Sequence, residues 1–340
     1  LANFTKLSKA YDSLMKNVVI FFLFIILFIS CSEPSLIIDV SKSKSKLDFR
    51  HYEQDLFNIN TENLETSLDQ LAPKYPVFIN GEYKDPTKLL ELNDYLNNEL
   101  NIKLFSDWNS KIGSYDKIKE KLNHAFSHYK HYFPKDSLPV IYTYISSVNY
   151  TTPVVVKNNE ILIGIDLFYG EDYEIYSQDR IPKYLSKNYK KEYITPIVIR
   201  SFAKNKYSES IHGETLLENM IGLGKLEYFV EAMMPNVMDS IRFQFTTRQM
   251  IWCYSHEKSF WKHLALKEHL FSKDYRNYKK FIQHGPFVSS VERESPGRAG
   301  IFIGYRIIKE YMDNNPEVTL NELMTNKDFT TIFRDSKYNP

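Results

Sequence analysis

The spacing of apolar residues predicts two amphipathic helices in the first half of the chain. Apolar positions three and four residues apart run from Thr87 to Leu100 and again from Ser114 to Phe133, a spacing that places side chains on one face of a helix. Pro134 follows the second segment directly. We expect that helix to end there, because proline cannot continue a helix.

The period of the pattern changes near the middle of the chain. Residues 139–147 (PVIYTYISS) and 152–168 (TPVVVKNNEILIGIDLF) are rich in β-branched and aromatic side chains, which favour strands. The four residues 157–160 (KNNE) separate two apolar runs and predict a turn. We therefore expect one strand followed by a β-hairpin.

Helical spacing dominates the second half. No Pro-rich linker, internal repeat or low-complexity break follows Leu47, so residues 47–340 are predicted to be one domain. The expected fold class is α+β, a mostly helical single domain with a small central sheet. The predicted helices cover residues 195–204, 214–233, 239–272, 297–313 and 319–324.

The N-terminus carries the longest apolar run. Residues 18–29 are twelve consecutive apolar residues, whereas a membrane span needs about twenty. The run follows Met15 and Lys16, as the apolar region of a signal peptide follows its basic start. We interpret residues 1–30 as upstream residues and a signal peptide that begins at Met15, and the Ser- and Lys-rich residues 31–46 as a flexible tether.

Charge and cysteine content exclude two classes of protein. The 43 Lys and Arg residues balance 42 Asp and Glu residues, for a net charge of +1, so no global field favours nucleic acid as a partner. The two cysteines, Cys31 and Cys253, are too few for a disulfide framework or a cysteine-based zinc site. Cys253 lies among large apolar residues, and we expect a buried, unreactive thiol there; a catalytic nucleophile is the alternative.

The spacing of histidines in the sequence decides whether a zinc site is expected. The HExxH motif of zinc peptidases is absent from the sequence, and its nearest match begins at His256 but has Phe260 in place of the second His. His124 and His128 share one helix face at i and i+4 and are candidate zinc ligands. Ala125 stands where the motif has its general base, and no carboxylate has the spacing of a third ligand. A solvated or half-buried histidine face is the alternative.

Three charged residues are candidates for a cleft. Glu218 and Glu227 are either cleft carboxylates or helix-surface residues. Arg298 follows Pro296-Gly297 at the start of a predicted helix, where exposed amides could accept an anion together with the guanidinium; simple helix capping is the alternative. Within that helix Gly300 and Gly304 predict close packing against a neighbouring helix.

Residues 27–31 (LFISC) resemble the lipobox of bacterial lipoproteins, with Phe28 where the motif usually has Leu. The resemblance implies cleavage between Ser30 and Cys31 and lipid attachment at Cys31 through acyl chains such as palmitate. Two or more acyl chains hold a protein stably at a membrane. The mature protein would then be tethered without spanning.

The body of the chain resembles a known family. The segments that carry the resemblance are ILIGIDLFYGEDYEIY, TLLENMIGLGKLEYFVEAMMP, MIWCYSHEKSFW, SPGRAGIFIGYRIIKEYM and the terminal SKYNP, and they resemble the gliding-motility lipoprotein GldB family of Bacteroidetes. That family is similar in layout to predicted zinc peptidases. In this chain the first ligand helix corresponds to residues 196–204, which contain no His, and the third ligand position falls at Leu223.

The resemblance implies a peptidase-like fold that has lost its zinc ligands and needs no cofactor. The expected protein is anchored by lipid in the cell envelope, faces the periplasm and serves gliding motility through contacts with protein partners of the motility and secretion machinery, without catalysis. A zinc-dependent envelope hydrolase that uses His124, His128 and a distant carboxylate is the alternative. A third hypothesis is a binding protein for an anion or a peptidoglycan fragment in a cleft near Arg298.

Overall fold

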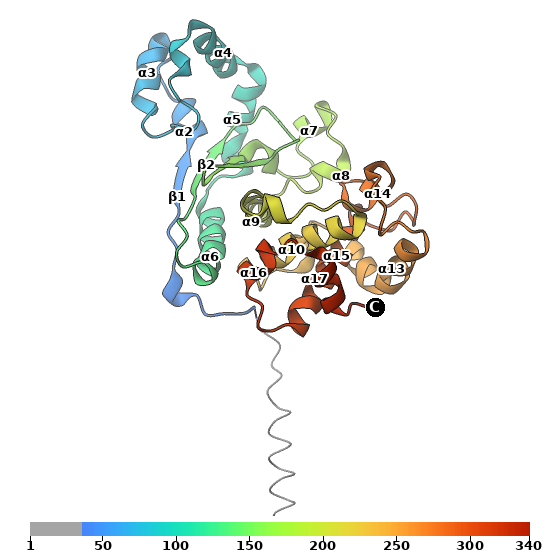
Figure 1. Cartoon of the computed structure of the whole chain (residues 1–340). Coiled ribbons are helices and arrows are strands. Elements are labelled where there is room, and N and C mark those ends of the chain that lie inside the picture. Colours follow the sequence, from blue (N-terminus) through green and yellow to red (C-terminus); the bar gives the residue numbers. More distant parts are fainter. Residues whose placement is uncertain (1–35) are drawn as a thin grey trace, which may run out of the picture. The chain divides into compact units, whose positions relative to one another are not determined.

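The computed structural model describes residues 36–340, which contain a four-stranded mixed sheet (Figure 1). The strands follow the order β1 (Asp48–His51), β2 (Val140–Tyr144), β4 (Glu160–Gly164) and β3 (Val154–Lys157). β1, β2 and β4 are parallel, and β3 runs antiparallel to β4. β3 is therefore an edge strand.

The predicted strand and hairpin are β2 and the β3–β4 pair. Asn158 and Asn159 form the turn with φ of +50° and +62°, a backbone conformation that Asn tolerates better than most residues and that matches the twist of a two-residue hairpin. The short turn folds β3 back onto the outer side of β4. This placement leaves the far side of β3 without a strand neighbour.

Helices of the first half cover the sheet and extend beyond it (Figure 1). α6 (Asp116–Tyr132) agrees with the predicted helix over 114–133. The predicted helix over 87–100 is instead two helices, because the side chain of Asn98 accepts hydrogen bonds from the amides of Leu100 and Asn101 and starts a new helix. The helices of this half are α2 (Tyr52–Leu56), α3 (Leu64–Leu71), α4 (Pro86–Asn97), α5 (Glu99–Lys111) and α6.

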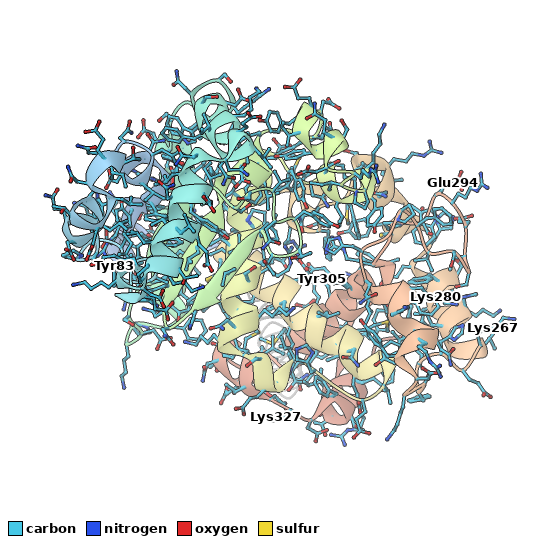
Figure 2. The ribbon with its side chains drawn as sticks, turned by 90° about the horizontal axis from the view of Figure 1, so that it is seen from above. Tyr83, Lys267, Lys280, Glu294, Tyr305 and Lys327 are labelled. Atoms are coloured by element: carbon cyan, nitrogen blue, oxygen red, sulfur yellow. The ribbon has the colours of Figure 1, made fainter. Side chains whose placement is uncertain are left out.

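The second half is built around α10 (Leu216–Met233), which packs along α15 (Ala299–Asn314). A Cβ atom on Gly304 would lie 1.7 Å from the carbonyl oxygen of Met220, so only glycine permits this approach. The close packing expected for Gly304 is confirmed. Figure 2 shows Tyr305 of α15 near the centre of the view, whereas Lys267 and Lys280 lie at the edge.

The long helix predicted over residues 239–272 is wrong. Gln244 has a φ of +56°, which no right-handed helix contains, and Thr246 forms a capping box with Gln249 that starts a new helix. Three short helices result. The second half comprises α7 (Glu174–Gln178), α8 (Lys183–Ser186), α9 (Ile194–Lys206), α10, α11 (Asp239–Arg242), α12 (Thr247–Ser255), α13 (Glu257–Leu266), α14 (Tyr275–Ile282), α15, α16 (Leu320–Thr325) and α17 (Phe329–Ser336).

The remaining predicted helices agree with α9, α10, α15 and α16, and the α+β class is confirmed. Between residues 36 and 340 no helix is long and apolar enough to cross a membrane. The predicted signal peptide, its cleavage site at Ser30 and the lipid site at Cys31 lie outside the described residues.

Candidate functional site

A cleft of about 770 Å³ lies along the edge strand β3. Helix α9 and residues 185–189, at the end of α8 and directly after it, form its other walls. Both elements have mixed apolar and polar side chains on the faces that line the cleft. The lining residues of the walls are Val154 and Val156 of β3, Ile197, Arg200, Ser201, Lys204 and Asn205 of α9, and Leu185, Asn188 and Tyr189.

The charged side chains that line the cleft are all cationic. Arg200 and Lys204 come from α9, one helical turn apart, and Arg298 comes from the residue before α15. No Asp or Glu is among the lining residues of this described cleft. The cleft therefore offers charge to an anion from two separate elements.

Arg200 is already paired. Its Nε and Nη2 atoms each donate to a carboxylate oxygen of Glu227 in α10, at 2.8 Å, and Nη2 also donates to the carbonyl of Arg242. Nη1 donates to Oε1 of Gln244 at 3.3 Å. This bidentate geometry is the strong form of an Arg–carboxylate pair. Glu227 therefore neutralises most of the charge of Arg200 before any ligand binds.

Arg298 differs, because it is a buried cation without a carboxylate. Its residue is 7% exposed, and Nη2 donates to the carbonyl of Phe243 at 2.8 Å. The guanidinium carbon lies 5.6 Å from the centre of the Phe245 ring. Burial and then the charge of Arg200 lower the pKa of Arg298 to about 10, against a smaller opposing effect of Glu227. Arg298 therefore remains charged at neutral pH.

The positive charge of Arg298 lowers the pKa of two neighbouring side chains. Arg298 is the largest cause of the lowered pKa of His284, ahead of burial, Arg200 and Lys187, so this imidazole is neutral at pH 7. Burial and then Arg298 also lower the pKa of Lys187. Arg200 and Lys187 thus both act on Arg298 as like charges, whereas Glu227 is the one carboxylate whose charge acts on it among the described residues. The inner end of the cleft therefore favours an additional negative charge.

The backbone of β3 presents unused hydrogen-bonding groups beside the cleft. The carbonyl of Pro153 accepts from the amide of Gly164 in β4, so the backbone groups of Val154 and Val156 point to the other side because strand residues alternate. The Val156 carbonyl accepts from the side chain of Asn205 at 3.1 Å. Within the described chain, the amides of Val154 and Val156 and the carbonyl of Val154 have no other strand to pair with.

Of the cleft residues predicted from the sequence, Arg298 lines the cleft and Glu227 lies behind it as the partner of Arg200. Glu218 does not line it. Its side chain instead accepts from the amides of Glu214 and Thr215 and caps α10. Sequence reasoning missed Arg200 and Lys204, although their i, i+4 spacing in a predicted helix was a usable signal.

Among residues 36–340, no third metal ligand joins His124 and His128. The rings of His124 and His128 are 4.9 Å apart, and His128 is buried with no hydrogen-bond partner for its Nδ1 atom in the described structure. Residues 36–340 contain no group of three or more His, Cys, Asp or Glu side chains placed to hold a metal ion. His256 stacks on Trp252, and burial raises the pKa of the Cys253 thiol.

The face of α9 can be compared with a zinc-peptidase helix. HExxH places His, Glu and His at i, i+1 and i+4 so that two ligands and a base face one site. The α9 side chains that line the cleft at this spacing are Arg200, Ser201 and Lys204. The helix that the family resemblance aligned with the ligand helix therefore presents two cations and a hydroxyl.

Comparisons with known proteins give one match. The family model described as gliding motility protein GldB covers residues 33–340. No curated protein and no solved structure matches the chain. Because the match covers nearly the whole sequence, the chain belongs to the GldB family of gliding motility proteins.

Proposed function

We propose that this protein serves gliding motility by binding a protein partner in the cleft beside β3, and not by catalysis. Membership of the GldB family implies the role in motility. The observation that carries the binding role is the charge of the cleft, where Arg298 and Lys204 meet no lining carboxylate and Arg200 is paired with Glu227 behind the wall. Such a surface attracts an anionic group of a partner.

Peptide hydrolysis needs a nucleophile or an activated water and a group to accept its proton. At the positions of α9 that face the cleft, Arg200 and Lys204 are cationic side chains and not the carboxylate or imidazole of a usual general base. Ser201 lies between them without a His partner for its hydroxyl among the hydrogen bonds of the described residues. These side chains suit the recognition of an anion better than general base catalysis.

The proposal includes attachment to the membrane. Lipidation of Cys31 would leave residues 31–46 as a tether and allow the domain to reach partners from the membrane surface. We place the domain in the periplasm, with partners in the motility and secretion machinery. The lipobox resemblance of residues 27–31 supports this arrangement.

The test is complementation of a strain that lacks the gene. Cells that express the full chain with Arg298→Gln or Lys204→Glu are expected to lose spreading on agar, because each change removes positive charge from the cleft. Arg276→Gln is the matched control, because Arg276 is 85% exposed, pairs with Asp274 and does not line the cleft. Normal spreading by both cleft variants at wild-type protein levels would contradict the proposal.

A further inference from the structure

We propose that the ligand of the cleft is an extended peptide segment that pairs with the free edge of β3 and places a carboxylate on Arg298. The inference rests on the proposed function, since it names the class of partner for the same cleft. It joins two features of separate elements, a strand edge and a buried cation. Addition of a strand to a sheet edge is a recurring mode of peptide recognition.

The strand edge supplies the first half of the argument. The amides of Val154 and Val156 and the carbonyl of Val154 point away from β4, at the two-residue spacing that a paired strand requires. Free edges invite unwanted pairing, so proteins usually cover or charge them. Here Val154 and Val156 line a cleft and do not lie on an open face, which restricts access to a single chain.

The side chain of Asn205 marks where the pairing stops. The Nδ2 atom of Asn205 donates a hydrogen bond to the carbonyl of Val156. β3 ends one residue later, at Lys157. The backbone groups of β3 that remain for a ligand are therefore the amide of Val156 and the amide and carbonyl of Val154, and residues 151–152, which precede β3, also line the cleft. A peptide would run along this part of the edge.

The buried cation supplies the second half. Arg298 donates through Nη2 to one backbone carbonyl, and no ion pair or further hydrogen bond engages its guanidinium within residues 36–340. A buried charge without a counter-ion is costly. A carboxylate that enters the cleft would accept from the remaining N–H groups and supply the missing negative charge.

Arg298, and not Arg200, is the anchor for this carboxylate. Arg200 already binds both carboxylate oxygens of Glu227, whereas Lys204 is an exposed residue of α9 that guides an anion inwards by its charge. The apolar side chains of Leu185, Val154 and Ile197 between these positions give the peptide surface to bury. A free inorganic anion would use the cation alone and leave the strand edge unused.

The carboxylate can belong to an acidic side chain or to the end of a chain. The full chain, purified in detergent, is mixed with pools of peptides of about eight residues, the length of an ordinary strand, whose varied positions contain neither Asp nor Glu. One pool is blocked at both ends and carries a fixed Glu, the second has Gln there, and the third has Gln and a free C-terminal carboxylate. Bound peptides are quantified by mass spectrometry, with inorganic phosphate as competitor.

We expect retention of the first or the third pool, which identifies the source of the carboxylate, and no retention of the second. Arg298→Gln and Lys204→Glu should weaken binding by about tenfold or more, as for loss of a charged hydrogen bond or its steering charge. Arg276→Gln should leave binding unchanged. Lys204→Glu keeps the test decisive should Arg298→Gln fold poorly, since residue 204 is exposed.

A proline substitution in β3 tests strand pairing separately from the charge of the cleft. Val156→Pro removes an amide that points away from β4, so no β3–β4 hydrogen bond is lost, and proline is tolerated at such edge positions. We expect it to weaken binding about tenfold, whereas Val156→Thr, which keeps the amide and the branched shape, should not. Equal binding by the proline and threonine variants would overturn the proposal, as would equal retention of all three pools.

The two proposals fail in different ways. If no pool binds but the cleft variants still abolish spreading, the peptide inference is wrong and the binding role in motility stands. If peptides bind as expected but the cleft variants spread normally, the cleft is a peptide site without a role in motility.

Discussion

Arg200 of α9 and Glu227 of α10 form a two-point ion pair behind the cleft, with both donor–acceptor distances at 2.8 Å. The side chains are 15% and 2% exposed. The pair joins the two helices that the family resemblance aligned with the metal-ligand helices of zinc peptidases. Glu227 is also the one carboxylate among residues 36–340 whose charge acts on Arg298, and its oxygens are bound by Arg200. The Arg298 guanidinium therefore remains available to a ligand.

The ion pair predicts the effect of Glu227→Gln. The change leaves a buried Arg200 without its counter-ion, and removal of one partner of a buried pair costs about 3 kcal/mol. We expect urea unfolding of the full chain to shift to lower urea by the corresponding amount. Glu209→Gln is the control, because Glu209 pairs with Lys327 on the surface, and it should change the midpoint little. Equal midpoints for both variants would show that the buried pair contributes no stability.

Close packing of α10 and α15 predicts the effect of Gly304→Ala. A Cβ atom at residue 304 would meet the backbone of Met220, which cannot rotate away, so we expect the free energy of unfolding to fall by more than about 3 kcal/mol. Gly285→Ala is the matched control, because a Cβ there comes no closer than 3.7 Å to other atoms. Thermal unfolding compares the two variants, and a native-like Gly304→Ala protein would contradict this packing.

A buried histidine predicts acid sensitivity. Burial, and then the charges of His124 and His131, lower the pKa of His128 to about 4, from 6.5. Between these values the unfolded chain binds a proton that the folded chain excludes, so stability falls as the pH drops from 6.5 to 4. His51 has the same direction, with its pKa also about 4 through burial, Lys119 and Lys74.

His128→Leu should flatten this part of the stability curve, since the leucine has no proton to bind and the unpartnered Nδ1 atom is removed. Exposed His212 provides the control, because its charge is not among those that lower the pKa of His128, and His212→Gln should keep the wild-type slope. The measurement is the urea midpoint at several pH values from 7 to 4. A slope that is unchanged by His128→Leu would disprove the assignment.

The lipobox resemblance predicts the effect of Cys31→Ala. Without the thiol no lipid can be attached, and we expect the precursor to remain uncleaved and to label no longer with radioactive palmitate. Cys253→Ala is the control for loss of a thiol, because Cys253 is buried in the domain. Normal maturation and labelling of Cys31→Ala would contradict lipid attachment at this residue.

Periodicity predicted those elements of the fold whose local signals agree with their packing. The hairpin of β3 and β4 has two strand-like runs around an Asn-Asn turn, and α6, α9, α10 and α15 have clear boundaries. The break inside residues 239–272 was missed because the apolar spacing continues through it. Its cause is the positive φ of Gln244 together with the cap at Thr246, which periodicity does not report.

The cleft was predictable only in part. Arg298 was a candidate because it precedes a helix, and the structure adds the reason for its importance, which is burial without a carboxylate. The side chains of residues 187, 200 and 284 interact electrostatically with Arg298. They come from separate elements, and their proximity depends on tertiary packing such as that of α9 against β3 and of α15 against α10. Glu218 was a cleft candidate from the sequence, and its role as a helix cap follows from the position of Thr215 three residues earlier.

Photo-crosslinking in gliding cells tests the binding role of the cleft most directly. A photoreactive residue in place of Asn205, at the rim beside β3, should capture a specific protein partner, and the added substitution Lys204→Glu should abolish the crosslink. The same residue in place of Lys327, which is exposed and does not line the cleft, should not capture that partner. A crosslink pattern that is identical at both positions and unaffected by Lys204→Glu would contradict the account.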